Sequence, residues 1–140
     1  MLTMFNWLRG HKTIAAFCFY TWAAIIFAAC LLPGKDVPSL SVFQYDKVIH
    51  FAIFALMAFL FLLLFSNPVL KKEGLIVFLS CTAYGYCVEL LQGSGITEGR
   101  SFDHYDALAD AVGTALGVVL FFTFKHFGDK QKAKSLLDKD

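Results

Sequence analysis

Four long apolar segments constrain the fold of this chain more than any other feature. They lie at about 13–32, 48–66, 74–92 and 105–124 in a chain of 140 residues that is 58% hydrophobic. An α-helix needs about 20 residues to cross the hydrocarbon core of a bilayer. Lipid offers no partner for backbone polar groups, so such segments must form helices. We therefore expect an all-α membrane protein with four transmembrane helices, forming one domain over residues 1–127 as an antiparallel bundle.

The distribution of basic residues predicts the orientation of this bundle. Lysine and arginine in short flanks and connections concentrate on the cytoplasmic side of a membrane. Nine of them flank one end of the predicted helices: Arg9, Lys12, Lys71, Lys72, Lys125, Lys130, Lys132, Lys134 and Lys139. The other end has Lys35, Lys47 and Arg100. Both termini, including a polar tail over 128–140, are therefore expected in the cytoplasm.

Polar residues collect at the outer ends of the second and third predicted helices. The second helix begins close to Asp46, Lys47 and His50, and a spacing of four places Asp46 and His50 on one helix face. The third helix ends with Glu89 and Gln92, which are three residues apart and therefore also neighbours. These side chains are predicted to lie near the outer membrane boundary.

The fourth predicted helix has three aspartates on one face. Asp103, Asp106 and Asp110 recur at positions i, i+3 and i+7, and either Ser101 or Asp103 is a suitable N-cap. With a rise of 1.5 Å per residue, Asp110 lies about 9–10 Å along this helix. Ionisable groups at such depth usually face the bundle interior or a wet cavity. We therefore expect a polar pocket that opens outward.

Two glycines support an inward orientation of the same helix face. Gly113 and Gly117 follow Asp106 and Asp110 at helical spacing and form a G-x-x-x-G pattern. This pattern is typical of surfaces where two membrane helices pack closely. The fourth helix is therefore predicted to turn both its carboxylates and its small residues toward a neighbouring helix.

The predicted pocket offers residues for acid–base chemistry, anion recognition and metal binding. Candidate catalytic residues are Glu89, Asp106 and His50; candidate substrate-binding residues are Arg100, Lys47, Gln92 and Asp110; candidate metal ligands are Asp46 and Asp103. Carboxylates and a histidine can exchange protons with a substrate, and the planar guanidinium of arginine binds phosphate in a bidentate manner. A divalent metal is the one cofactor these residues suggest, with oxygen ligands favouring Mg²⁺ or Ca²⁺ and histidine permitting Zn²⁺ or Mn²⁺.

The same residues also have a structural interpretation. Asp46 and Lys47 could be ordinary interfacial charges at a helix end, and Asp103 could be only a helix cap. Glu89 and Asp110 fit this interpretation least well, because they lie inside apolar segments. A buried network of hydrogen bonds and ion pairs is therefore an alternative to a binding site.

Two sequence segments together resemble the VanZ-like family of small bacterial membrane proteins. They are "DKVIHFAIFAL", which begins at Asp46, and "ELLQGSGITEGRSFDHYDALADAVGTALG", which begins at Glu89. The resemblance extends over about residues 46–120. It departs from the family pattern at Asp110, where the family usually has asparagine, and this adds a potential charge to the predicted pocket.

The resemblance implies a multi-pass protein of the bacterial inner membrane with a role at the cell envelope. The namesake of the family is associated with low-level resistance to the glycopeptide teicoplanin. Combined with an outward pocket, this predicts recognition or modification of an anionic envelope lipid or a lipid-linked cell-wall precursor. Membrane lipids are the expected partners, and nucleic acid is not expected because most basic residues lie at the opposite end of the helices. The alternative is a non-enzymatic structural or regulatory membrane module, and the residues are compatible with both.

Overall fold

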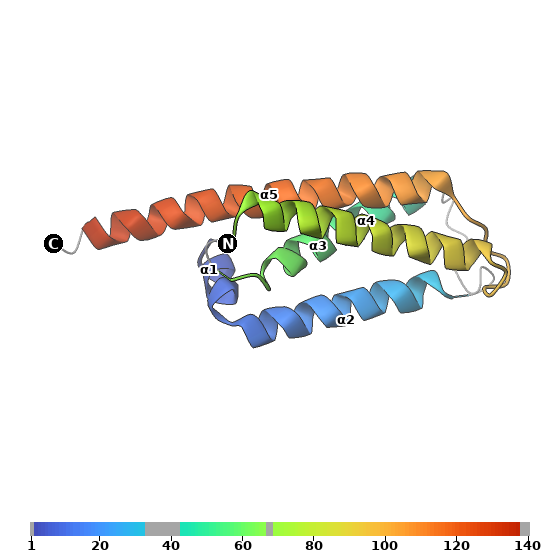
Figure 1. Cartoon of the computed structure of the whole chain (residues 1–140), viewed down its shortest axis with the longest axis horizontal. Coiled ribbons are helices and arrows are strands. Elements are labelled where there is room, and N and C mark those ends of the chain that lie inside the picture. Colours follow the sequence, from blue (N-terminus) through green and yellow to red (C-terminus); the bar gives the residue numbers. More distant parts are fainter. Residues whose placement is uncertain (1, 33–42, 67–68, 138–140) are drawn as a thin grey trace.

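The structure is a computed structural model that describes residues 2–32, 43–66 and 69–137, and all regular secondary structure in these residues is helical. The helices are α1 (Leu2–Gly10), α2 (Lys12–Cys30), α3 (Phe43–Leu62), α4 (Lys71–Gly93) and α5 (His104–Leu137). In Figure 1, α2 to α5 run in alternating directions, and α1 lies across the end where α2 begins. The prediction of an all-α fold is confirmed.

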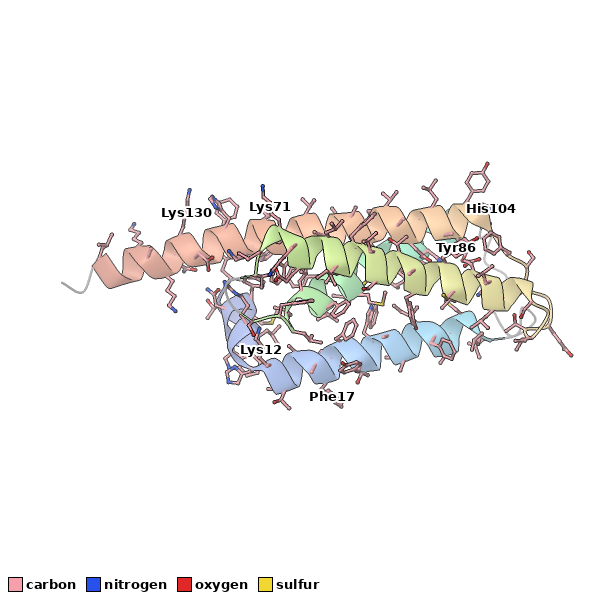
Figure 2. The ribbon with its side chains drawn as sticks, viewed as in Figure 1. Lys12, Phe17, Lys71, Tyr86, His104 and Lys130 are labelled. Atoms are coloured by element: carbon pink, nitrogen blue, oxygen red, sulfur yellow. The ribbon has the colours of Figure 1, made fainter. Side chains whose placement is uncertain are left out.

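Three of the described helices are long and apolar enough to cross a membrane: Lys12–Cys30, Lys71–Gly93 and His104–Lys134. Their outer faces are apolar as well, and Phe17, which points away from the bundle in Figure 2, is 72% exposed. Such side chains are favourably solvated by lipid rather than by water. These helices are those of a multi-pass membrane protein, while a fourth crossing by α3 stays a prediction.

The closest helix packing in the described bundle joins α3 to α5. A Cβ atom added at Gly113 would overlap the backbone carbonyl of Phe51, and one added at Gly117 would overlap that of Ala55. The two backbones can therefore approach this closely only because α5 has glycine at both positions. The predicted G-x-x-x-G packing surface is confirmed, and it holds the carboxylates of α5 against α3.

The described helices differ from the predicted segments at α1, at the end of α5 and at α3, which covers Phe43–Leu62 rather than about 48–66. α1 precedes the first apolar segment, and its Phe5 ring packs 5.5–5.8 Å from the ring centroids of Phe59, Phe121 and Phe124. α5 continues past the predicted end at residue 124 as far as Leu137. The packing of Phe5 among these three rings explains why α1 folds back onto the bundle. The part of the predicted tail after Leu137 lies outside the described residues, as do Lys35 and Lys139 from the orientation argument.

α2 is fastened to the bundle by side chains that donate to backbone carbonyl oxygens. Trp22 Nε1 on α2 donates to Ile53 O on α3 at 3.0 Å, and Tyr84 Oη on α4 donates to Ala23 O on α2 at 2.8 Å. At the end where α3 stops, Lys12 Nζ donates to Leu63 O at 2.6 Å. A helix leaves its last carbonyl groups without intrahelical partners, so Lys12 satisfies one of these acceptors.

Candidate functional site

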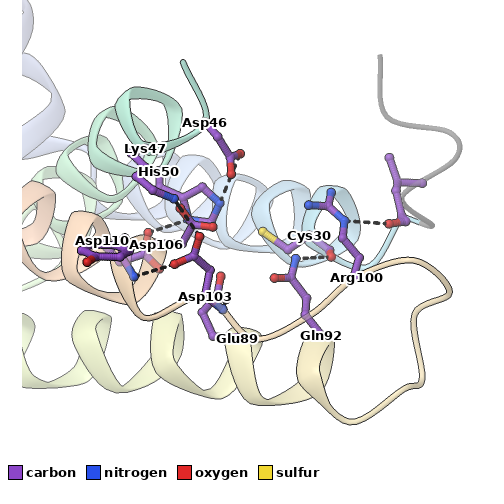
Figure 3. A network of polar contacts seen from close by, with 12 residues as sticks. Cys30, Asp46, Lys47, His50, Glu89, Gln92, Arg100, Asp103, Asp106 and Asp110 are labelled. Atoms are coloured by element: carbon purple, nitrogen blue, oxygen red, sulfur yellow. Dashed lines mark hydrogen bonds and ion pairs between the residues drawn. The ribbon is translucent and has the colours of Figure 1, made fainter. Parts of the chain in front are cut away.

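Charged side chains from three helices meet at the end of the bundle where α3 and α5 begin and α4 ends (Figure 3). We call this group the polar layer, and its members are Asp46, Lys47, His50, Glu89, Asp103, Asp106 and Asp110. Their convergence follows from chain direction, because α3 and α5 start at the same end and pack closely there. All seven had been singled out from the sequence.

Lys47 joins α3 to the beginning of α5. Its Nζ donates to Asp103 Oδ2 at 2.9 Å and to Asp106 Oδ1 at 2.7 Å. Asp103 also accepts the backbone N–H of Tyr105 through Oδ1 at 2.7 Å, which makes it the N-cap of α5. The hydrogen bond from Lys47 holds the pKa of the Asp103 carboxyl below its ordinary value. Asp103 therefore serves as a charged cap.

His50 lies between carboxylates of α3 and α5. Its Nδ1 is 2.9 Å from Asp110 Oδ1, whereas its Nε2 is 4.0 Å from Asp46 Oδ1. His50 and Asp110 are both buried. The space for Asp110 is provided by Gly85 on α4, because a Cβ at that position would lie 2.5 Å from Asp110 Oδ2. The principal partner of His50 is therefore Asp110 on the neighbouring helix.

Glu89 extends from α4 toward the side chains of α3 and α5 and is fully buried, with 0% of its surface exposed. Its Oε2 accepts the backbone N–H of Asp103 at 3.1 Å. Its Oε1 has no hydrogen-bond partner among the described residues. A buried polar atom without a partner is costly, by about 1–3 kcal/mol or more for a charged group. Glu89 is therefore the least satisfied carboxylate of the polar layer.

The polar layer carries more negative than positive formal charge. It has five carboxylates, at Asp46, Glu89, Asp103, Asp106 and Asp110, against one lysine and one histidine. Lys47 donates to the two carboxylates nearest the start of α5, whereas the basic side chain that the described structure groups with the deeper pair, Glu89 and Asp110, is His50. Such an arrangement attracts cations and opposes direct binding of an anion.

Gln92 and Arg100 contact the end of α2 rather than the polar layer. Gln92 Nε2 donates to Cys30 O at 2.6 Å, and Arg100 Nε donates to Leu32 O at 3.4 Å. Figure 3 shows both side chains beside Cys30, apart from His50. The sequence grouped them with the carboxylates; in the structure both bond to backbone carbonyls at the end of α2, beside the polar layer, and we call this pair the rim.

Two overlapping groups in the described residues have the composition of a metal site. One contains Asp46, His50 and Asp106, the other contains His50, Glu89 and Asp110, and one donor atom from each member lies within 4.8 Å of the others. Asp103, a predicted ligand, belongs to neither group; its two oxygens accept hydrogen bonds from Lys47 Nζ and from the backbone N–H of Tyr105.

Thr114 is a buried polar residue that the sequence analysis missed. It lies on α5 one turn beyond Asp110, and its Oγ1 is buried without a hydrogen-bond partner among the described residues. The available signal was its i+4 spacing from Asp110. Its position extends the polar face of α5 toward the centre of the bundle.

The fold and the polar layer define a helical membrane protein whose ionisable residues gather at one end of the bundle. The chain belongs to the VanZ/LLP1 family, whose family model matches residues 2–125. The match includes all seven residues of the polar layer and confirms the resemblance to VanZ-like proteins. A search of curated proteins gave no match, and neither did a search of solved structures.

Proposed function

We propose that this VanZ/LLP1 protein lies in the bacterial inner membrane and uses its polar layer, on the outer face, to recognise a phosphate-bearing envelope lipid or lipid-linked cell-wall precursor. The observation that carries the proposal is the burial of Glu89 and Asp110, from two helices, against His50 from a third. Ionisable groups at membrane depth are expensive and usually mark a ligand or proton pathway. We infer an anionic headgroup because Arg100 lies beside the polar layer (Figure 3).

In this proposal the rim and the polar layer have different roles. Arg100 holds the phosphate, since its guanidinium offers the bidentate geometry that phosphate prefers. Gln92 supports the same rim through its bond to Cys30. Behind them, Glu89 and His50 are the groups that can accept or donate a proton. Proton transfer of this kind would allow the headgroup to be modified as well as bound.

The test of lipid recognition is native mass spectrometry of the detergent-purified protein. We expect the wild-type chain to retain a phosphate-bearing lipid, and Arg100→Ala to reduce its occupancy at least several-fold. Glu98→Gln is the matched control, because it removes an exposed charge from the same connection between α4 and α5. Equal lipid occupancy in wild type, Arg100→Ala and Glu98→Gln would refute the proposal.

A structural role is the second candidate, and one observation favours it. The hydrogen bonds of the polar layer join different helices: Lys47 and His50 connect α3 to α5, and Glu89 connects α4 to the cap of α5. Such a network would fix the register of the helices without binding anything. It predicts that Glu89→Gln unfolds the bundle while the wild-type protein carries no lipid.

The family resemblance extends the proposal to the response to glycopeptides. Expression of the wild-type chain in a susceptible Gram-positive host should raise the minimum inhibitory concentration of teicoplanin, and Arg100→Ala should remove the increase. The membrane level of each variant is measured in parallel. An identical increase with both proteins would separate the resistance phenotype from the proposed lipid site.

A further inference from the structure

We infer that His50, Glu89 and Asp110 together hold a divalent cation of the zinc class, with one ligand supplied by each of α3, α4 and α5. This inference deepens the proposed function, since the cation would bridge the acidic polar layer to a phosphate. With the cation bound, His50 and Glu89 are its ligands, and this role replaces their proposed part in proton transfer. The link to phosphate rests on that proposal, whereas the metal site stands on its own geometry.

The three side chains lie close enough together to surround one cation. One donor atom from each lies within 4.8 Å of the other two, and all three residues are buried. Zinc bonds of about 2.0–2.2 Å place two ligands of a tetrahedral ion about 3.4 Å apart. His50 Nδ1 and Asp110 Oδ1 are 2.9 Å apart, so this hydrogen-bonded pair would have to separate by about 0.5 Å to hold a zinc ion between them. The donor atom of Glu89 lies within 4.8 Å of those of His50 and Asp110, so it would have to approach each of them by at most about 1.4 Å.

The unpartnered oxygen of Glu89 is an independent indication of a ligand. Glu89 Oε1 is buried and has no hydrogen-bond partner in the described structure, while Oε2 is held by the backbone N–H of Asp103. Metal-binding carboxylates are commonly oriented in this way by a hydrogen bond to the second oxygen. A cation would give Oε1 the partner that the protein does not provide.

The charge balance of the deeper carboxylates fits one divalent cation. Lys47 contacts Asp103 and Asp106 and does not reach Glu89 or Asp110 by any described hydrogen bond. Two ionised carboxylates and a neutral imidazole carry a formal charge of about −2, which a divalent ion neutralises. The ion therefore removes an electrostatic cost that no described basic side chain removes.

The donor set selects the type of cation and leaves room for a ligand. Mg²⁺ and Ca²⁺ prefer oxygen donors throughout, whereas one imidazole with two carboxylates suits Zn²⁺. Zinc sites with three protein ligands keep a fourth position for water or substrate. A phosphate oxygen in that position would resolve the conflict between an acidic site and an anionic headgroup.

The experiment measures zinc directly in the purified full-length protein. Elemental analysis and competition with a chromophoric chelator should give one Zn²⁺ per chain for wild type. Glu89→Gln and Asp110→Asn should each weaken zinc binding by at least 10-fold, as loss of a ligand or its orientation does. Glu98→Gln should bind as wild type does. Circular dichroism and gel filtration establish that each variant is folded.

Three outcomes would overturn the inference. One is wild-type protein that takes up no zinc from a zinc-supplemented buffer. Another is loss of zinc with Asp46→Asn but not with Glu89→Gln, which would assign the ion to the other group around His50. If Glu89→Gln fails to fold, Co²⁺ is added to the wild-type protein instead. Visible absorption bands of tetrahedral cobalt are then expected, and their absence would refute the site.

The same preparations separate this inference from the proposed function. Zinc bound to wild type without any retained phosphate lipid would support the cation and refute lipid recognition. If the wild-type protein retains lipid, loses it with Arg100→Ala and binds no zinc, lipid recognition is supported and the cation site is refuted. Native mass spectrometry resolves both ligands on a single chain, so each proposal has its own readout.

Discussion

Lys47 forms ion pairs with two carboxylates, Asp103 and Asp106, and so stabilises the start of α5. Its side chain is 29% exposed, whereas that of Asp106 is 9% exposed, so the ion pair is only partly screened by solvent. Removing one partner of a buried ion pair leaves an uncompensated charge and is strongly destabilising. The partial exposure of Lys47 moderates this effect.

Replacing Lys47 with methionine should therefore destabilise the bundle. We expect Lys47→Met to lower the free energy of unfolding by about 1–3 kcal/mol, less than the loss of a fully buried pair. Lys72→Met is the control: its side chain is 72% exposed, so its effect should stay within about 0.5 kcal/mol. Unfolding by SDS in mixed micelles measures both. Equal stabilities would show that the ion pairs of Lys47 contribute nothing.

Asp103 gives the stability of the protein a defined dependence on pH. Its pKa is lowered in the folded state, so the ionised carboxylate stabilises the fold at pH values above the unfolded pKa of about 3.9. That stabilisation is lost as the pH falls through the lower, folded pKa. Asp103→Asn retains a good N-cap but removes the charge opposite Lys47.

The wild-type protein should accordingly exceed Asp103→Asn in melting temperature at pH 7, with the difference shrinking below about pH 4. Thermal melts of the two proteins in the same detergent, from pH 7 to pH 3, measure this difference. A difference that stays constant over the whole range would mean that the charge of Asp103 has no part in stability.

Single residues show where sequence reasoning succeeded and where it failed. Asp103 was predicted as a possible N-cap because capping is local and depends on the next few residues. His50 was predicted on the same helix face as Asp46, and the two lie 4.0 Å apart, but its closer partner is Asp110, sixty residues away in the chain. Arg100 was grouped with the carboxylates by proximity in sequence. Its actual contact at Leu32 depends on how α2 packs, which local spacing cannot reveal.

At the scale of elements, the packing of α3 against α5 determines the position of the polar layer. Gly113 and Gly117 bring the two backbones together just beyond Asp106 and Asp110, so these carboxylates are carried against His50 and Lys47. A side chain at either glycine would push the helices apart. The effect would then reach the polar layer, one turn or more away.

Gly117→Ala should destabilise the protein even though alanine favours helices. Its Cβ would overlap the carbonyl oxygen of Ala55, and overpacking of this kind costs about 1–3 kcal/mol. Gly10→Ala is the matched control, because nothing lies within 4 Å of a Cβ at that position. SDS unfolding should show a loss only for Gly117→Ala. A stabilised Gly117→Ala protein would show that helix propensity outweighs the close contact.

The sequence predicted the long helices better than the short one. Apolar length alone identifies a helix in lipid, and the structure places helices over all four predicted segments. α1 lacks that length, and it is held by the packing of Phe5 among rings from α3 and α5. Such a contact depends on the assembled bundle. The structure extends α5 beyond its predicted end for a related reason. Its last turns are polar, so the length of the apolar segment does not reveal them.

At the scale of the whole molecule, chain connectivity predicts a fourth crossing. α2 ends at the end of the bundle that holds the polar layer, and α4 begins at the opposite end (Figure 1). The chain must therefore pass from one end to the other between them. α3 has 20 residues and a length of about 30 Å, which equals the thickness of the hydrocarbon core. We therefore expect α3 to cross the membrane beside the three spans.

Four crossings would place Leu2 and Leu137, the first and last described residues, on the same side, and the basic residues predict that this side is the cytoplasm. Single cysteines can test this after the four native cysteines are replaced by alanine. His11→Cys and Lys130→Cys mark the two ends, and Ser94→Cys marks the connection between α4 and α5; all three positions are exposed. In intact spheroplasts a membrane-impermeant maleimide should label Ser94→Cys alone, and permeabilisation should expose the other two.

Labelling of His11→Cys and Lys130→Cys on opposite sides would show an odd number of crossings. Labelling of both, but not of Ser94→Cys, from outside would invert the orientation and place the polar layer in the cytoplasm, away from any outer-face lipid.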